Sequence, residues 1–90
     1  SLEAVTIAID SSQAEQRRNL FFSLLNLGEA ELKLGHFKAA LSARQQALEV
    51  AQNPSNLLLE AYALEGIGEV HHELGNRTLA QESFQQALEL

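Results

Sequence analysis

The sequence lacks several features that define other classes of protein. It has no cysteine, which excludes disulfide bonds and thiolate metal sites. No apolar run approaches the ~20 residues of a membrane span and no signal-peptide pattern is present, so we expect a soluble, cytoplasmic protein. Methionine is absent too, even at the first position, and we interpret the 90 residues as an excerpt of a longer protein.

Basic residues and helix breakers are also scarce. Six Lys and Arg stand against twelve Asp and Glu, and the formal net charge of −6 disfavours binding to nucleic acid or to an anionic membrane. Proline occurs once, at Pro54, and glycine five times, so few residues can interrupt long helices. Apolar residues make up 46% of the chain, which is ordinary for a small globular domain.

The chain repeats itself after forty positions. Of the 27 residues from 24 to 50, eleven are identical forty positions later, including Gly28 with Gly68 and Gly35 with Gly75. A period of roughly 20–50 residues is typical of a solenoid, in which each unit buries its apolar face only against its neighbours.

Hydrophobic spacing, caps and breakers divide the chain into five predicted helices. These cover residues 2–10, 13–34, 37–52, 54–74 and 77–90. Asp10 to Ser12 end the first helix, and Ser12 with Glu15 has the capping-box spacing that starts the second. Short connections force neighbouring helices antiparallel. We therefore predict an all-α fold, an α-solenoid of antiparallel helix hairpins.

Turn chemistry supports the remaining boundaries. Gly35 and Gly75 each occupy the position after a helix where the backbone turns left-handed, which glycine adopts without strain. Asn53 is suited to cap the fourth helix and Pro54 to its first turn, while Asn76 is suited to cap the last helix.

The predicted core follows one stripe of each helix. Its members are Leu20, Leu24, Leu27 and Gly28; Phe37, Ala40, Leu41, Ala47 and Leu48; Leu57, part of Tyr62, Leu64, Ile67 and Gly68; and Leu79, Ala80, Phe84, Ala87 and Leu88. A glycine in mid-helix costs about 1 kcal/mol relative to alanine, and this cost is repeated at Gly28 and Gly68. We therefore expect the paired helix to approach closely there, with Ala40 or Ala80 opposite the glycine.

This pattern resembles the tetratricopeptide repeat: a bulky residue, a leucine-glycine pair and a closing glycine, then alanines and an aromatic in the second helix. The matching residues are Leu24, Leu27-Gly28, Leu34-Gly35, Phe37, Ala40 and Ala47-Leu48, then Leu64, Ile67-Gly68, Leu74-Gly75, Ala80, Phe84 and Ala87-Leu88. The common period is 34. A period of forty is similar to the long-helix variety found in kinesin light chains, in GoLoco-binding adaptors and in bacterial regulators.

The resemblance implies one domain over residues 1–90. Residues 2–10 correspond to the second helix of a preceding repeat, residues 13–52 to the first repeat and residues 53–90 to the second. Some positions depart from the family pattern. Glu31 and His71 stand where the family has a tyrosine, and Arg44 replaces the aromatic of the first repeat. We expect these changes to thin the core of the first unit.

The resemblance also implies a concave groove that holds an extended peptide or a partner helix. Residues of each repeat's first helix, off the core stripe, line this groove in the family. The corresponding residues here are Phe22, Leu25, Asn26, Glu29, Lys33, Tyr62, Glu65, Glu69, His72 and Glu73. Some family members use lysines and asparagines at such positions to clamp a C-terminal carboxylate. Only Asn26 fits that use, whereas Leu25, Glu29, Glu65 and Glu69 contradict it, and we reject a carboxylate clamp.

Glu65, Glu69 and Glu73 follow one another at i, i+4 and i+8 and form an acidic ridge on one helix face. Such a ridge gains nothing within the helix, because like charges at i, i+4 repel slightly. It is either a solvated face or one wall of a groove for a segment with Lys or Arg beside an apolar anchor. Phe22, Leu25 and Tyr62 would seat that anchor.

No other chemistry is indicated. His71 and His72 have zinc-ligand spacing to Glu69 and Glu73, but they fall on different helix faces, and we expect no metal site. Gly66 and Gly68 lack the third glycine and the preceding strand of a phosphate loop. We expect no catalytic residues, no cofactor and no enzyme activity within these residues.

Two functions remain open. The first is a protein–protein interaction module, or scaffold, that binds a peptide or partner helix in the groove. The alternative is a structural spacer within a larger regulatory superhelix, with no ligand of its own. Both ends of the stack also carry apolar residues suited to meet another repeat, so end-to-end self-association is expected. These residues are Val5, Ile7 and Ile9 at one end and Leu79, Leu88 and Leu90 at the other.

Overall fold

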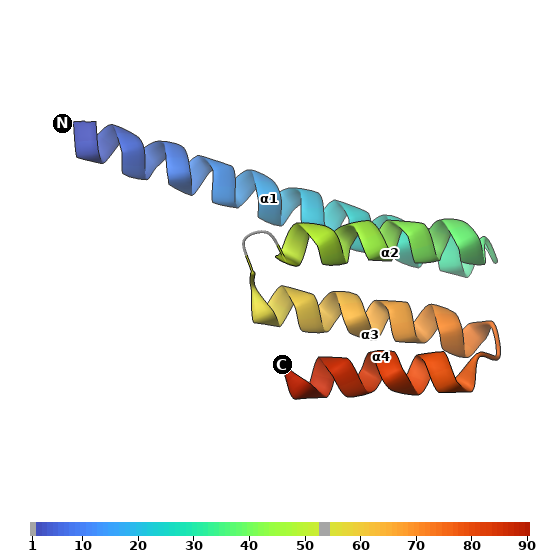
Figure 1. Ribbon diagram of the computed structural model, residues 1–90. Coiled ribbons are helices and arrows are strands. Elements are labelled where there is room, and N and C mark those ends of the chain that lie inside the picture. Colours follow the sequence, from blue (N-terminus) through green and yellow to red (C-terminus); the bar gives the residue numbers. More distant parts are fainter. Residues whose placement is uncertain (1, 53–54) are drawn as a thin grey trace.

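The computed structural model describes the backbone of residues 2–52 and 55–90, and the side chains of residues 12–52 and 55–90. The fold is all-α. Its helices are α1 (Leu2–Lys33), α2 (Phe37–Gln52), α3 (Leu57–Glu73) and α4 (Arg77–Glu89). They form two antiparallel hairpins, α1–α2 and α3–α4, that lie side by side in chain order (Figure 1). Within the described residues, no helix is long and apolar enough to cross a membrane.

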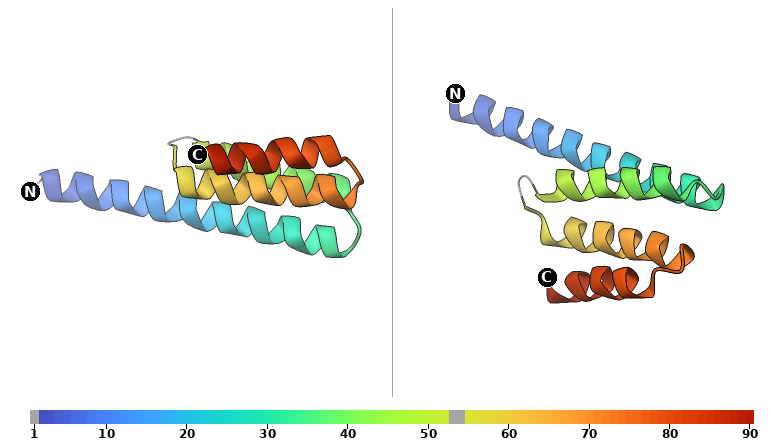
Figure 2. Two further views of the ribbon diagram at one scale, coloured as in Figure 1. Left: turned by 90° about the horizontal axis from the view of Figure 1, so that it is seen from below. Right: turned by 45° about the vertical axis from the view of Figure 1, so that its right-hand side comes forward.

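The helices stack in an open row and do not close into a bundle. Each helix packs on the next one in the chain, and α1 also contacts α3. Among the described residues, no Cα atom of α4 comes within 8 Å of α1 or α2. The radius of gyration of 15.1 Å exceeds the ~12 Å of a compact chain of this length. Because α1 touches α3 while α2 does not touch α4, the first helices of the two hairpins lie on the inner side of the curvature (Figure 2).

The N-terminal segment differs from the sequence prediction. Residues 2–10 were expected to form a separate helix, but α1 runs without a break from Leu2 to Lys33, and its first half extends beyond the rest of the stack (Figure 1). The expected end at Asp10 to Ser12 and the capping box of Ser12 with Glu15 are therefore wrong. Asp and Ser inside a helix cost only a few tenths of a kcal/mol, and no glycine or proline precedes Gly28 to end the helix.

The turns that close α1 and α3 are built alike. Gly35 and Gly75 both have φ of 79°, the left-handed conformation expected from the sequence. The amide of Gly35 donates to the carbonyl of Leu32 at 3.0 Å, and the amide of His36 donates to that of Glu31 at 2.8 Å. The second turn repeats both bonds forty positions later, at 3.0 and 2.8 Å. These paired bonds satisfy helix-end carbonyls that would otherwise lack a partner.

The starts of α3 and α4 correct two predictions. Helix α3 begins at Leu57, and its N-cap is Asn56, whose Oδ1 accepts a hydrogen bond from the Leu59 amide at 3.2 Å. Asn53 and Pro54, the expected cap and first turn, lie outside the described residues. Asn76 does occupy the N-cap position of α4, but its side chain makes no capping hydrogen bond.

The core of α1 lies one position away from the predicted stripe. Phe21 is fully buried, whereas Leu20 and Leu27, expected inside, are each 50% exposed. Phe21 and Gly28 share one helix face, and Leu20 and Leu27 share the adjacent face. Because both faces are apolar, the sequence alone did not identify the one that meets α2. The central cluster around Phe21 also contains Ala47, Ala51 and Ala63.

Three other predicted core residues are exposed. These are Leu57 at 54%, Leu79 at 45% and Leu88 at 82%. For α4 the reason is its position at the end of the row, where only α3 covers it among the described residues. Its buried residues, Ala80 and Ser83, face α3, and the leucines of its outer face stay accessible.

Candidate functional site

Each hairpin places a large side chain over its mid-helix glycine. A Cβ atom added to Gly28 would lie 2.6 Å from Cγ of Arg44, and one added to Gly68 would lie 2.6 Å from Cε1 of Phe84. The predicted close approach at both glycines is therefore correct. The nearest side chain is not Ala40 or Ala80, however, but the residue one helical turn further along α2 or α4.

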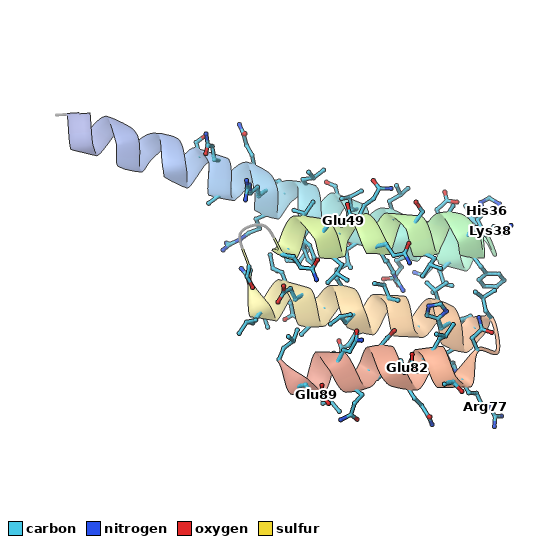
Figure 3. All side chains as sticks on the ribbon, viewed as in Figure 1. His36, Lys38, Glu49, Arg77, Glu82 and Glu89 are labelled. Carbon is cyan, nitrogen blue, oxygen red and sulfur yellow. The ribbon has the colours of Figure 1, made fainter. Side chains whose placement is uncertain are left out.

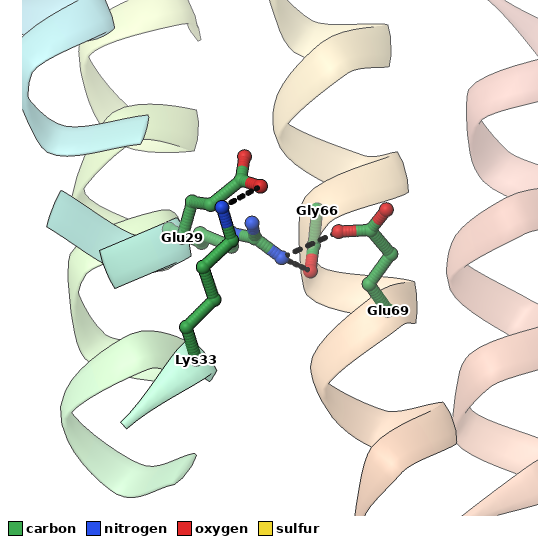
Figure 4. A network of polar contacts seen from close by, with 5 residues as sticks. Glu29, Lys33, Gly66 and Glu69 are labelled. Carbon is green, nitrogen blue, oxygen red and sulfur yellow. Dashed lines mark hydrogen bonds and ion pairs between the residues drawn. The ribbon is translucent and has the colours of Figure 1, made fainter. Parts of the chain in front are cut away.

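Arg44 connects the two hairpins. Its side chain lies between Gly28 of α1 and Gly66 of α3, and the residue is 2% exposed. Its Nη1 donates to the Gly66 carbonyl at 2.7 Å and to Oε2 of Glu69 at 2.9 Å (Figure 4). The bond to a carboxylate is charge-assisted, and the Glu69 side chain is 60% exposed beside it. Arg44 therefore fixes a surface carboxylate from a buried position.

An open groove of about 640 Å³ lies at the end of the stack where the two hairpin turns are found. We refer to it as the turn-end groove, and its lining residues are Glu29, Leu32, Lys33, Glu69, His72, Glu73 and Phe84. The first three belong to the end of α1, the next three to the end of α3, and Phe84 to α4. The groove therefore joins the two hairpins.

The turn-end groove carries an excess of negative charge. Three carboxylates line it against one ammonium group, that of Lys33, which lies 3.5 Å from Glu29. Arg44 pairs with Glu69 from beneath, while within residues 12–52 and 55–90 Glu73 forms no ion pair. Helices α1 and α3 both end here, and each C-terminus adds a partial negative charge. The site therefore favours a cation.

The structure divides the ten residues expected to line the groove into two groups. Five of them line the turn-end groove, namely Glu29, Lys33, Glu69, His72 and Glu73. Phe22 and Tyr62 lie outside it but share helix faces with Glu29 and Glu69, which follow them by seven residues. They are 39% and 43% exposed, and the ring of Phe22 packs edge-on against Phe21 at 5.1 Å.

The other three expected residues lie elsewhere. Leu25 is half-buried and packs against the core cluster around Phe21, so it supports the fold beneath the surface. Asn26 and Glu65 are exposed and do not line the turn-end groove. The ridge of Glu65, Glu69 and Glu73 thus contributes its last two carboxylates to the groove and not the first.

Sequence reasoning missed Leu32, Phe84 and Arg44 as parts of the site. Leu32 is half-buried, and Phe84 had been placed in the core. Arg44 was recognised only as a departure from the family pattern. Gly66 was a signal for it: this second glycine of α3 has Asn26 as its counterpart in α1, and its missing side chain makes room for the arginine.

The two adjacent histidines lie in different surroundings. His72 is exposed and lines the turn-end groove, whereas His71 is half-buried and its Nδ1 is buried with no hydrogen-bond partner among the described residues. Over the same part of the chain, no group of three or more His, Cys, Asp or Glu is placed to hold a metal ion.

The outer face of α4 is a second accessible surface. Leu79, Leu88 and Leu90 are 45%, 82% and 47% exposed on it. At the opposite end of the chain, the side chains of Val5, Ile7 and Ile9 lie outside the described residues. End-to-end self-association through these two surfaces stays a prediction.

Comparisons with known proteins agree with the repeat. A family model described as "Tetratricopeptide repeat" matches residues 20–90, which include both hairpins. A protein of Emericella nidulans named "Probable assembly chaperone of rpl4" is 43% identical over 67 residues, covering 74% of this chain and 17% of that protein. The chain therefore spans less than a fifth of the length of this relative. No solved structure matches the chain.

Proposed function

Because the chain belongs to the tetratricopeptide repeat family, we propose that it is a protein-binding module whose turn-end groove holds a basic, apolar-anchored segment of a partner protein. Family membership points to protein–protein interaction and to a non-catalytic role. The name of the Emericella nidulans relative, an assembly chaperone, supports a protein as the partner. The forty-residue period further supports placing the repeats in the long-helix variety of the family.

The lining of the turn-end groove carries this proposal. Glu29, Glu69 and Glu73 surround a surface to which Leu32 and Phe84 contribute apolar atoms. A lysine or arginine of the partner would meet the carboxylates, and a neighbouring apolar side chain would cover the leucine and the phenylalanine. Charge at such a rim steers association and sets specificity more than it adds affinity.

Glu73 is the carboxylate to test first. Replacing Glu69 by lysine would place a second cation beside the buried Arg44, so a loss of binding would be confused with a loss of stability. Glu73→Lys avoids this problem, because Glu73 is exposed and forms no ion pair among the described residues. Glu49→Lys is its matched control, since Glu49 is an exposed residue of α2 that does not line the groove (Figure 3).

The probe is a fluorescent peptide with blocked termini in which two lysines flank a leucine, and the readout is fluorescence anisotropy at two salt concentrations. We expect Glu73→Lys to weaken binding about fivefold and to reduce its salt dependence, while Glu49→Lys leaves both near the wild-type values. Equal effects of the two variants would assign the binding to net charge and remove the groove from the proposal.

A spacer role is the second candidate, and one observation favours it. Glu29 and Glu69 already have cationic partners within the chain, which lowers their attraction for an external cation. If the wild-type chain binds neither the basic peptide nor an acidic peptide of the same length, the spacer role replaces the groove proposal.

A further inference from the structure

A small pocket of about 170 Å³ lies at the opposite end of the stack from the turn-end groove. We refer to it as the loop-end pocket, and its lining residues are Ala14, Arg17, Arg18, Val50, Ala51, Ser55, Asn56 and Leu59. Its charged lining residues are two arginines of α1, and no carboxylate lines it. The two ends of the inner surface therefore carry opposite charges.

Helix geometry places the two charges on one line along α1. Arg18 and Glu29 are eleven residues apart, which is close to three full turns, so both side chains leave the same face of the helix. At 1.5 Å per residue, about 16 Å separates their positions along the axis. Phe22 lies between them on that face and is 39% exposed.

Helix α3 supplies the matching apolar residues alongside. Leu58 and Tyr62 precede Glu69 by eleven and seven residues, so they share its helix face, and they are 63% and 43% exposed. Because α1 and α3 are in contact, their faces form one strip on the inner side of the stack. Along this strip the order is arginine, exposed apolar side chains, and carboxylates.

From this order we infer that the inner strip binds an extended segment of a partner protein with opposite charges at its two ends. The segment carries Lys or Arg in the turn-end groove, apolar side chains over Phe22, Leu58 and Tyr62, and Asp or Glu beside Arg18. An extended chain advances about 3.3 Å per residue, so the ~16 Å between the two charge positions corresponds to about five residues. This inference rests on the proposed function and adds to it the acidic end of the ligand and the spacing of its charges.

Three labelled peptides with blocked termini test the inference. The bipolar peptide has two lysines, then about five residues that include leucine and phenylalanine, then two glutamates. The second peptide replaces both glutamates by glutamine. The third keeps all four charges but has only two residues between them, which is too short to reach from one end of the strip to the other.

The protein variants are Arg18→Glu and its control Arg77→Glu. Arg18 is exposed, so its replacement should leave the fold intact, which circular dichroism checks. Arg77 is an exposed residue of α4 that lines neither the turn-end groove nor the loop-end pocket (Figure 3). Both substitutions change the net charge by the same amount.

We expect Arg18→Glu to weaken binding of the bipolar peptide three- to fivefold, and to leave the glutamine peptide and the short peptide unchanged. Arg77→Glu should leave all three affinities unchanged. Replacing the glutamates of the bipolar peptide by lysines should restore affinity to the Arg18→Glu protein, because the new pair recreates the attraction.

If Arg18→Glu weakens all three peptides equally, or has no effect on the bipolar peptide, the inference is wrong. The proposed function survives that result as long as Glu73→Lys still weakens binding of the glutamine peptide. If the wild-type protein binds none of the three peptides, the inference and the proposed function are both wrong.

Discussion

The two hairpins have the same backbone register but fill the space over their mid-helix glycine with different residues. Arg44 covers Gly28 in the first hairpin, and Phe84, forty positions later, covers Gly68 in the second. In both, an added Cβ would come within 2.6 Å of the covering side chain. The comparison shows that the glycine answers to the bulk of its neighbour, whether that neighbour is a cation or an aromatic ring.

The two covering residues differ in what they reach beyond their own hairpin. Arg44 continues to the second hairpin and bonds to the Gly66 carbonyl and to Glu69, whereas Phe84 is 37% exposed at the edge of the turn-end groove. An arginine at the junction adds directional bonds between hairpins that an aromatic ring cannot form. The same position thus fixes the hairpin stack in one repeat and contributes to the candidate site in the other.

The largest expected effect comes from removing this junction. Arg44→Ala should lower the free energy of unfolding by about 2–3 kcal/mol, because it leaves a void between two glycines and removes both bonds to α3. Arg44→Phe, which copies the second hairpin, should cost less than half as much. Urea denaturation followed by circular dichroism measures both, with the exposed Lys38→Ala as control. Equal costs for the alanine and phenylalanine variants would contradict the role given to side-chain bulk.

A smaller effect is expected from closing the space under Phe84. Gly68→Ala gains about 1 kcal/mol in helix propensity but forces a methyl group against the ring, which costs more, so we expect a net loss of about 1–2 kcal/mol. Adding Phe84→Leu should recover part of that loss, because the smaller side chain can move aside. A stabilised Gly68→Ala protein in the same denaturation assay would show that the two helices are further apart than described.

The smallest effect should be the same in both hairpins. Gly35→Ala and Gly75→Ala each force an L-residue into the left-handed conformation at φ of 79°, and no other atom lies within 4 Å of the added methyl group. Each should therefore cost about 1 kcal/mol from backbone strain alone. Thermal melts of the two variants should shift by similar amounts, and a clear difference between them would show that the two turns are not equivalent.

The sequence revealed the parts of the fold that depend on local rules. The repeat of forty residues, the left-handed glycines at 35 and 75, and the close packing at Gly28 and Gly68 all follow from backbone requirements that few residues satisfy. The break expected at Asp10 to Ser12 failed because residues that favour a cap are also tolerated inside a helix.

Other features could not be predicted, because several residues satisfied the same rule. Leu20 and Phe21 both begin apolar stripes on α1, and only the position of α2 decides that Phe21 is buried. Five of the ten expected groove residues do line the turn-end groove, since helical spacing fixes which residues share a face. The link between Arg44 and Glu69 joins residues 25 positions apart, and no local pattern predicts such a pairing.

The most direct test of the account is a chemical-shift map of the labelled protein titrated with the basic peptide. We expect the largest amide shifts at the ends of α1 and α3, around Glu29 to Lys33 and Glu69 to Glu73, with little change around Glu49 on α2. Shifts confined to the outer face of α4, near Leu79 and Leu88, would place the binding site away from the turn-end groove and contradict its proposed role.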